Sequence, residues 1–195
     1  MLVIRDKMDF KTFLIISDQA VSKEFLKRDL KNFDDAMLFV RDLTYARNPN
    51  KKDLLTVFSD NCSTCGPKHA LLKLLINENN FKGFQLMLGI FKMSQENSPL
   101  VKATLEKYKL DYLPEAHNYL RYNGAMIDIT KKVWNKEAIE KVIVEEREIE
   151  ADQISDFKVN YHKNFLKRWI AENKIPYTLN QIWSIREQCI VDLSK

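Results

Sequence analysis

The sequence predicts a single domain of the α+β class, with helical segments toward both ends and an antiparallel hairpin between them. Apolar residues recur at helical spacing behind Asp34 and again after Thr178. Between these segments, residues 116–130 form two strand-like runs on either side of Asn123-Gly124, a dipeptide that favours a two-residue hairpin turn. Helical segments that flank a hairpin in this way are typical of α+β folds.

Length and composition favour one globular domain over residues 1–195. The chain has 195 residues, of which 45% are hydrophobic and 30% charged, which is enough to bury a sizeable core. Its 31 basic and 27 acidic residues give a net charge of +4 and are mixed along the chain, so we do not expect a nucleic acid partner. No apolar run approaches the roughly 20 residues that span a bilayer, and the N-terminus meets a charge too early for a secretory signal. We therefore expect a cytoplasmic protein without a membrane partner.

The first forty or so residues are predicted to be helical. Asp34 is the expected helix cap, and residues 47–50 form the loop that ends the segment. The apolar stripe behind the cap consists of Ala36, Phe39, Val40 and Leu43. A short apolar run, from Leu54 to Phe58, follows the loop.

A cysteine pair precedes the strongest helical segment of the chain. Two residues separate Cys62 from Cys65, and the following segment, 68–75, is rich in helix-forming residues. Pro67 suits the first helical turn, where its missing N–H donor costs nothing. Because three cysteines are a poor basis for a disulfide framework, we interpret the pair as reactive or metal-binding.

The segments that follow the cysteines are predicted from apolar runs and turn residues. Residues 84–93 are typical of a central strand, and Ser98-Pro99 opens a helix. The chain beyond the hairpin is expected to be helical, with Asn135 and Thr178 as caps. Cys189 lies on the apolar stripe of the last helix, and we expect it in the core.

The register of the hairpin brings a histidine and an aspartate together. If Tyr122 pairs with Ala125, His117 lies opposite Thr130, and Asp128 is its diagonal neighbour on the same face. The opposite face is apolar and is expected to pack on the core; it carries Leu120, Tyr122, Ala125, Ile127 and Ile129.

Cys65, His117 and Asp128 together supply the parts of a thiol-based catalytic site. A helix N-terminus and a neighbouring imidazolium lower the pKa of a thiol, so that the nucleophilic thiolate exists at neutral pH. A carboxylate fixes the tautomer and orientation of the imidazole, and backbone N–H groups at the helix start can receive an oxyanion. We therefore predict these three residues as the catalytic ones.

Three short blocks carry a resemblance to a known family. Residues 65–72, 114–117 and 127–130 resemble the Cys, His and Asp blocks of the transglutaminase-like superfamily, which has a papain-like core. The resemblance covers roughly residues 60–130. It implies a nucleophile helix packed on an antiparallel sheet, and acyl transfer on a peptide or protein amide as peptidase, amidase or transglutaminase, without a cofactor. Cys65 would be the nucleophile, His117 the base and Asp128 the orienting carboxylate.

The chain departs from the family pattern in two ways, and other interpretations stay open. Cys62 is a second cysteine close to the nucleophile, and Tyr119 is the only aromatic residue just after the histidine block. The run from Leu54 through the cysteine pair is also similar to the strand and redox motif of thioredoxin-like oxidoreductases. Zinc binding by the cysteines and a histidine lacks an evident fourth ligand. A non-catalytic binding module on the same fold is a further alternative, and the sequence does not indicate the oligomeric state.

Overall fold

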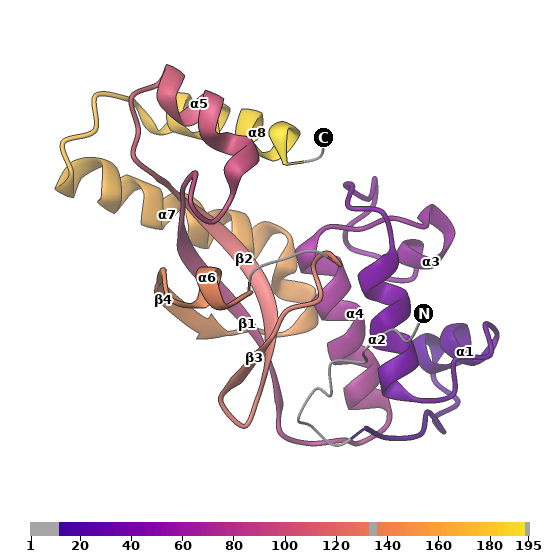
Figure 1. Ribbon diagram of the computed structural model, residues 1–195. Helices are drawn as coiled ribbons and strands as arrows, with labels where there is room; N and C mark the ends of the chain where they lie inside the picture. Colours follow the sequence, from indigo (N-terminus) through magenta and orange to yellow (C-terminus); the bar gives the residue numbers. More distant parts are fainter. Residues whose placement is uncertain (1–11, 133–135, 194–195) are drawn as a thin grey trace, which may run out of the picture.

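The structure, a computed structural model, describes residues 12–132 and 136–193. Within these ranges the strands form an antiparallel sheet in the order β3-β2-β1-β4 (Figure 1). The strands are β1 (Phe84–Met93), β2 (Leu113–Tyr122), β3 (Ala125–Ile127) and β4 (Ile143–Glu148). The helices are α1 (Ala20–Leu26), α2 (Phe33–Asp42), α3 (Thr56–Asp60), α4 (Cys65–Glu78), α5 (Lys102–Lys107), α6 (Lys136–Glu140), α7 (Asp156–Glu172) and α8 (Leu179–Asp192), with 3₁₀ turns η1 (Pro99–Val101) and η2 (Ala151–Ile154). This architecture confirms the predicted α+β class.

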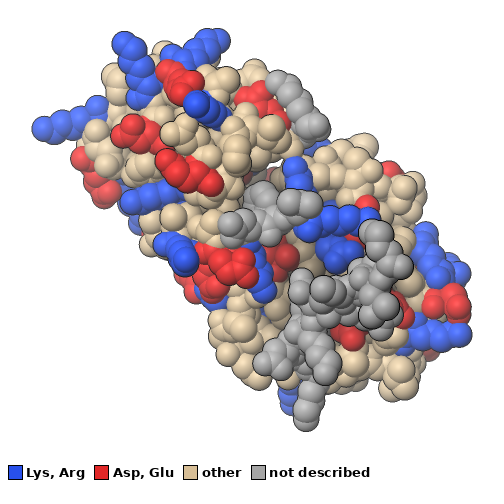
Figure 2. Space-filling model, viewed as in Figure 1, with Lys and Arg blue, Asp and Glu red and all other residues tan. Residues whose placement is uncertain are grey.

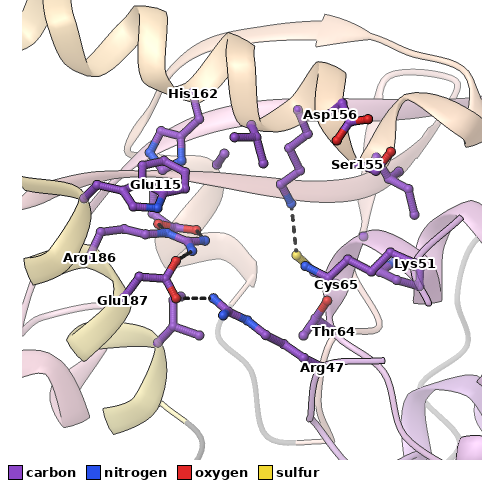
Figure 3. A pocket seen from close by; sticks show the side chains of 18 of the residues that line it. Arg47, Lys51, Thr64, Cys65, Glu115, Ser155, Asp156, His162, Arg186 and Glu187 are labelled. Carbon is purple, nitrogen blue, oxygen red and sulfur yellow. Dashed lines mark hydrogen bonds and ion pairs between the residues drawn. The ribbon is translucent and has the colours of Figure 1, made fainter. Parts of the chain in front are cut away.

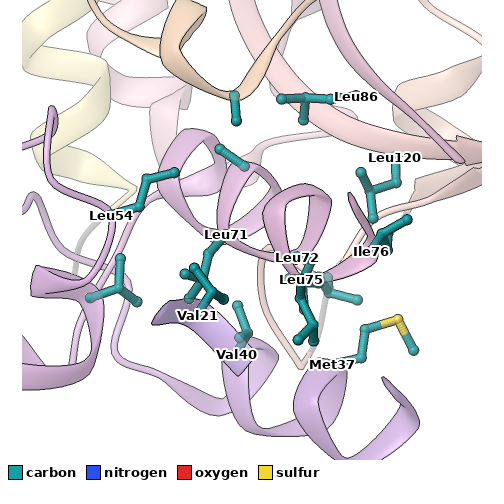
Figure 4. Packing of buried hydrophobic residues seen from close by; sticks show 14 of the residues in the cluster. Val21, Met37, Val40, Leu54, Leu71, Leu72, Leu75, Ile76, Leu86 and Leu120 are labelled. Atoms are coloured by element: carbon teal, nitrogen blue, oxygen red, sulfur yellow. The ribbon is translucent and has the colours of Figure 1, made fainter. Parts of the chain in front are cut away.

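Two apolar clusters lie at the two ends of the long β1–β2 pair. In Figure 1, helices α1 to α4 gather at one end of the pair, and α5, α7 and α8 gather at the other. The first cluster surrounds α4 and is shown in Figure 4; among its members are Leu71, Leu72, Leu75, Leu86 and Leu120. The second cluster includes Phe91, Met93, Leu113, Leu166, Trp169 and Ile182. Because β1 and β2 contribute to both clusters, the middle of β2 lies where they meet.

The hairpin forms as predicted up to the end of β3. Tyr122 pairs with Ala125, and Asn123 and Gly124 both adopt positive φ, at 50° and 84°, as a two-residue hairpin turn of this kind requires. The ladder ends at Ile127, so the predicted pairing of Thr130 with His117 does not form. The strand expected at residues 84–93 is confirmed at both ends.

The N-terminal half departs from the prediction in its boundaries. The cap of α2 is Asn32, whose side chain accepts a hydrogen bond from the N–H of Asp35, so the prediction of Asp34 as the cap is wrong. Asn32 has extended backbone angles, as an N-cap residue should, whereas Asp34 already lies in the first helical turn. The short apolar run from Leu54 to Phe58 forms a turn at 54–55 and then the start of α3.

The segment after the hairpin, which was predicted to be helical, contains the strand β4. β4 pairs with the free edge of β1, with a register shift between Ile90 and Phe91. Ion pairs tie β4 to its neighbours: Arg121 of β2 donates to Glu146, and Arg168 of α7 donates to Glu145. Charged side chains of both signs are interspersed over the face in Figure 2. Pairing with β1 therefore decides the conformation of this charged segment.

The last helix, α8, has the cap and the buried cysteine that the sequence predicts. Thr178 caps α8 in a capping box with Gln181, and Cys189 is fully buried, so both are confirmed. The expected cap Asn135 lies outside the described residues.

Lys68 is a buried lysine that fastens α4 to two neighbouring segments. Its side chain is fully buried, and its Nζ donates to the carbonyl oxygens of Arg41 (2.9 Å), Leu43 (2.9 Å) and Thr130 (3.0 Å). Three carbonyl groups satisfy the three N–H donors of an ammonium. Lys68 thus holds the segment after β3 against the first turn of α4.

We expect Lys68→Met to lower the free energy of unfolding by about 2–4 kcal/mol, because it leaves three carbonyl groups without their charged donor. Lys73→Met is the matched control on the same helix, since Lys73 donates to one carbonyl group, that of Phe84 (2.7 Å). Urea denaturation followed by tryptophan fluorescence measures both changes. An equal loss in the two variants would contradict the fastening role of Lys68.

Candidate active site

Cys65 is the first residue of α4 and faces a cavity. The N-cap residue, Thr64, has extended backbone angles, and its side chain does not cap the helix. The first N–H groups of a helix have no partner inside it, so the start of α4 offers donors beside the sulfur. Cys65 is 7% exposed. Figure 3 shows its sulfur pointing toward the middle of the pocket.

The predicted contact between His117 and Asp128 is present. The His117 Nε2 atom donates to Asp128 Oδ2 at 2.6 Å, and the carboxylate is fully buried. The other carboxylate oxygen accepts hydrogen bonds from the N–H (3.0 Å) and hydroxyl (2.6 Å) of Thr130. Both oxygens of Asp128 are therefore held, which fixes the plane of the imidazole ring.

The His117 ring also bonds to the sulfur of Cys65. Because Nε2 is bonded to Asp128, Nδ1 is the ring nitrogen that remains for the sulfur. Burial alone would lower the pKa of His117, but the charges of Asp128 and Cys65 and its hydrogen bonds to both raise that pKa to about 10. Burial raises the pKa of Asp128, yet His117 outweighs it and holds that pKa well below its usual range. The arrangement therefore favours an imidazolium between two anions.

Lys158 of α7 is a second cation at the sulfur, and the sequence analysis missed it. Its Nζ lies 3.6 Å from Cys65 Sγ and donates to Asn118 Oδ1 at 2.7 Å. Burial raises the pKa of Cys65, but the charge of Lys158, the charge and hydrogen bond of His117, and the N–H of Asn118 lower that pKa to about 6. Lys158 is one of 31 basic residues, and no motif distinguishes it.

His69 is a buried neutral histidine that holds the segment carrying Asp128. Its Nδ1 donates to the carbonyl oxygen of Cys65 (2.8 Å), and its Nε2 accepts from the N–H of Ile129 (3.0 Å). Burial lowers its pKa to about 4, although the nearby Asp128 acts in the opposite direction. A neutral ring with one donor and one acceptor fits both bonds.

A cavity of about 290 Å³ opens at the sulfur, between α4, β2 and the helices α7 and α8. Ion pairs line the wall opposite Cys65 in Figure 3: Arg186 donates to Glu115 in a bidentate pair, and Glu187 accepts from both Arg186 and Arg47. The bidentate pair is almost fully buried. His162 also lines the cavity and donates to the carbonyl oxygen of Pro114. This side of the cavity is therefore charged, and its side chains are held in place by their ion pairs.

The alternative readings of the cysteine pair gain no geometric support. Cys62 and Cys65 are both free thiols, and Cys62 does not line the cavity. Among the described residues, no group of three or more His, Cys, Asp or Glu side chains is arranged to hold a metal ion. The thioredoxin-like interpretation needs a strand at residues 54–58, where the structure has a turn followed by the start of α3.

Comparisons of the chain with protein-family models, with curated proteins and with solved structures found no match. Within residues 12–132 and 136–193, no helix has the length and apolar character needed to cross a membrane.

We expect alkylation of Cys65 by iodoacetamide to rise with a midpoint near pH 6, because the thiol pKa is lowered to about 6. The measurement uses Cys62→Ser protein, so that Cys62 does not contribute, and burial holds the pKa of Cys189 at about 12. Adding His117→Ala should move the midpoint upward by about one unit or more, since an opposite charge is lost. An unchanged midpoint would show that His117 does not stabilise the thiolate.

The pH dependence of stability tests the neutral state of His69. Between about pH 6.5 and pH 4 the unfolded histidine takes up a proton that the folded one does not, so stability falls as pH falls. The fall from this group is on the order of 3 kcal/mol. In His69→Gln the decline over this range should be shallower by that amount, measured by urea denaturation at each pH. Equal declines would mean that His69 is protonated in the folded protein.

Proposed function

We propose that the protein is a cysteine-dependent enzyme that transfers or hydrolyses the acyl group of an amide, with Cys65, His117 and Asp128 as its triad. The observation that carries the proposal is the His117 ring, bonded to the Asp128 carboxylate at 2.6 Å on one side and to the Cys65 sulfur on the other. The sulfur faces a cavity with room for part of a peptide or protein substrate. The resemblance to the transglutaminase-like superfamily supports the same assignment.

In the acylation step the thiolate of Cys65 attacks the carbonyl carbon of the substrate. The new S–C bond forms as the C=O π electrons move onto oxygen, and the oxyanion lies near the start of α4. As the intermediate collapses, the C–N bond breaks and the His117 imidazolium gives its proton to the leaving amine. Asp128 keeps the ring oriented and stabilises its charged form.

In the second step water or an amine releases the acyl group. The imidazole of His117, now neutral, takes a proton from the incoming nucleophile, which attacks the thioester carbonyl. Collapse of this second intermediate breaks the S–C bond and restores the thiolate. Water gives a carboxylic acid and an amine gives a new amide, so hydrolysis and transfer share the same three residues.

We expect p-nitrophenyl acetate to acylate Cys65 of Cys62→Ser protein, with a burst of p-nitrophenolate and an acetyl adduct detected by mass spectrometry. His117→Ala should slow the burst by on the order of 10²–10⁴-fold because the thiolate partner is lost. Asp128→Asn should slow it less, since the ring remains but its charged form is less stable.

Cys65→Ser is the control for the covalent step, because it keeps the shape of the site. A burst and adduct that persist in Cys65→Ser would remove Cys65 from the mechanism. If Cys65 neither acylates nor alkylates at any pH, the non-catalytic binding module becomes the better account of this fold.

A further inference from the structure

The charges around the sulfur include one cation that the triad does not explain. The Cys65 thiolate and the Asp128 carboxylate are negative, and the His117 imidazolium and the Lys158 ammonium are positive. The four charges cancel while the sulfur is a thiolate. When the sulfur bonds to a carbonyl carbon, its charge moves to the carbonyl oxygen, and the oxyanion becomes the only new charge that can balance Lys158.

We propose that Lys158 is a catalytic residue that holds the thiolate in the resting enzyme and then donates to the oxyanion of the tetrahedral intermediate. The inference rests on the proposed function and adds a residue to it. A preorganised donor aimed at developing charge in a water-poor site is often the largest single contribution to catalysis. Lys158 would supply that donor from α7, far from the triad in sequence.

The position of Lys158 fits an oxyanion donor. Its Nζ is 3.6 Å from Cys65 Sγ, and the attacked carbonyl oxygen is one bond away from the carbon that joins the sulfur. A Cβ added at Gly66 would lie 3.9 Å from the same Nζ, so the ammonium sits beside the backbone at the helix start. Pro67 has no N–H, so the backbone at the helix start offers one donor fewer to an oxyanion.

The Lys158 ammonium is held in place by a buried amide. It donates to Asn118 Oδ1 at 2.7 Å, and Asn118 Nδ2 donates to the carbonyl oxygen of Met87 at 3.0 Å. Asn118 is fully buried in β2, so it cannot easily move away. An ammonium has three N–H donors, so Lys158 can keep its bond to Asn118 while the donor to the sulfur passes to an oxyanion.

The exchange of partners conserves atoms and charge. Before attack, Lys158 donates to the thiolate; attack forms the S–C bond, moves the π electrons to oxygen, and leaves a neutral sulfur. The ammonium then donates to the oxyanion without giving up its proton. When the C–N or C–O bond of the leaving group breaks, the C=O bond re-forms, and Lys158 is still an ammonium with all of its protons.

The test compares two reactions of Cys65 in Cys62→Ser protein at one pH. Alkylation by iodoacetamide displaces iodide and makes no oxyanion, whereas acylation by p-nitrophenyl acetate does. The ratio of the acylation rate to the alkylation rate therefore cancels any change in the amount of thiolate. In Lys158→Met this ratio should fall by about 10²–10³-fold, the effect of losing one oxyanion donor. Lys158→Arg, which keeps the charge, should recover part of the loss.

Lys167→Met is the matched control, because Lys167 lies on α7 but is exposed and away from the cavity; its ratio should stay unchanged. Circular dichroism checks that each variant is folded. If Lys158→Met unfolds, Lys158→Gln replaces it, because glutamine retains a donor for Asn118 without the charge. The ratio in Lys158→Gln should fall by at least about 10-fold. A ratio within twofold of the parent in the folded neutral variant would overturn the role of Lys158. If the parent itself shows no acylation burst, the proposed function fails instead.

Discussion

The site depends on one buried carboxylate. The side chain of Asp128 is fully buried, and a buried charge without partners would cost several kcal/mol. Its partners come from separate parts of the fold: His117 from β2, and Thr130 from the segment that Lys68 fastens to α4. Satisfying this carboxylate therefore fixes the imidazole ring at the helix start, which in turn places a cation at the sulfur of Cys65.

Lys68 and Lys158, the two lysines near Cys65, have different physical roles. Lys68 gives all three donors to backbone carbonyl groups and is closed to solvent. Lys158 is half-buried, bonds to one amide oxygen and to the sulfur, and lines the cavity. The first lysine stabilises the fold around α4, and the second keeps an ammonium available where charge develops.

The two buried cysteines, Cys65 and Cys189, show how strongly the surroundings change the pKa of a thiol. Burial with Glu115 and Asp192 nearby raises the pKa of Cys189 to about 12. Burial also acts against the thiolate at Cys65, but Lys158 and His117 reverse the direction and bring the pKa to about 6. Both thiols are largely removed from water, so burial does not explain the difference between their pKa values. That difference comes from the cations Lys158 of α7 and His117 of β2.

Local sequence signals account for the turn and the pairing of the hairpin. Asn123-Gly124 predicts the turn, and the turn sets the register of the hairpin as far as Ile127. Asp128 lies just beyond this ladder, and its contact with His117 depends on the contacts of Ile129 with His69 and of Thr130 with Lys68. The contact of Lys158 with a sulfur 93 positions away, and the pairing of the charged segment of β4 with β1, depend on the tertiary structure. Such contacts depend on chain segments that meet through packing, and no local spacing or propensity encodes them.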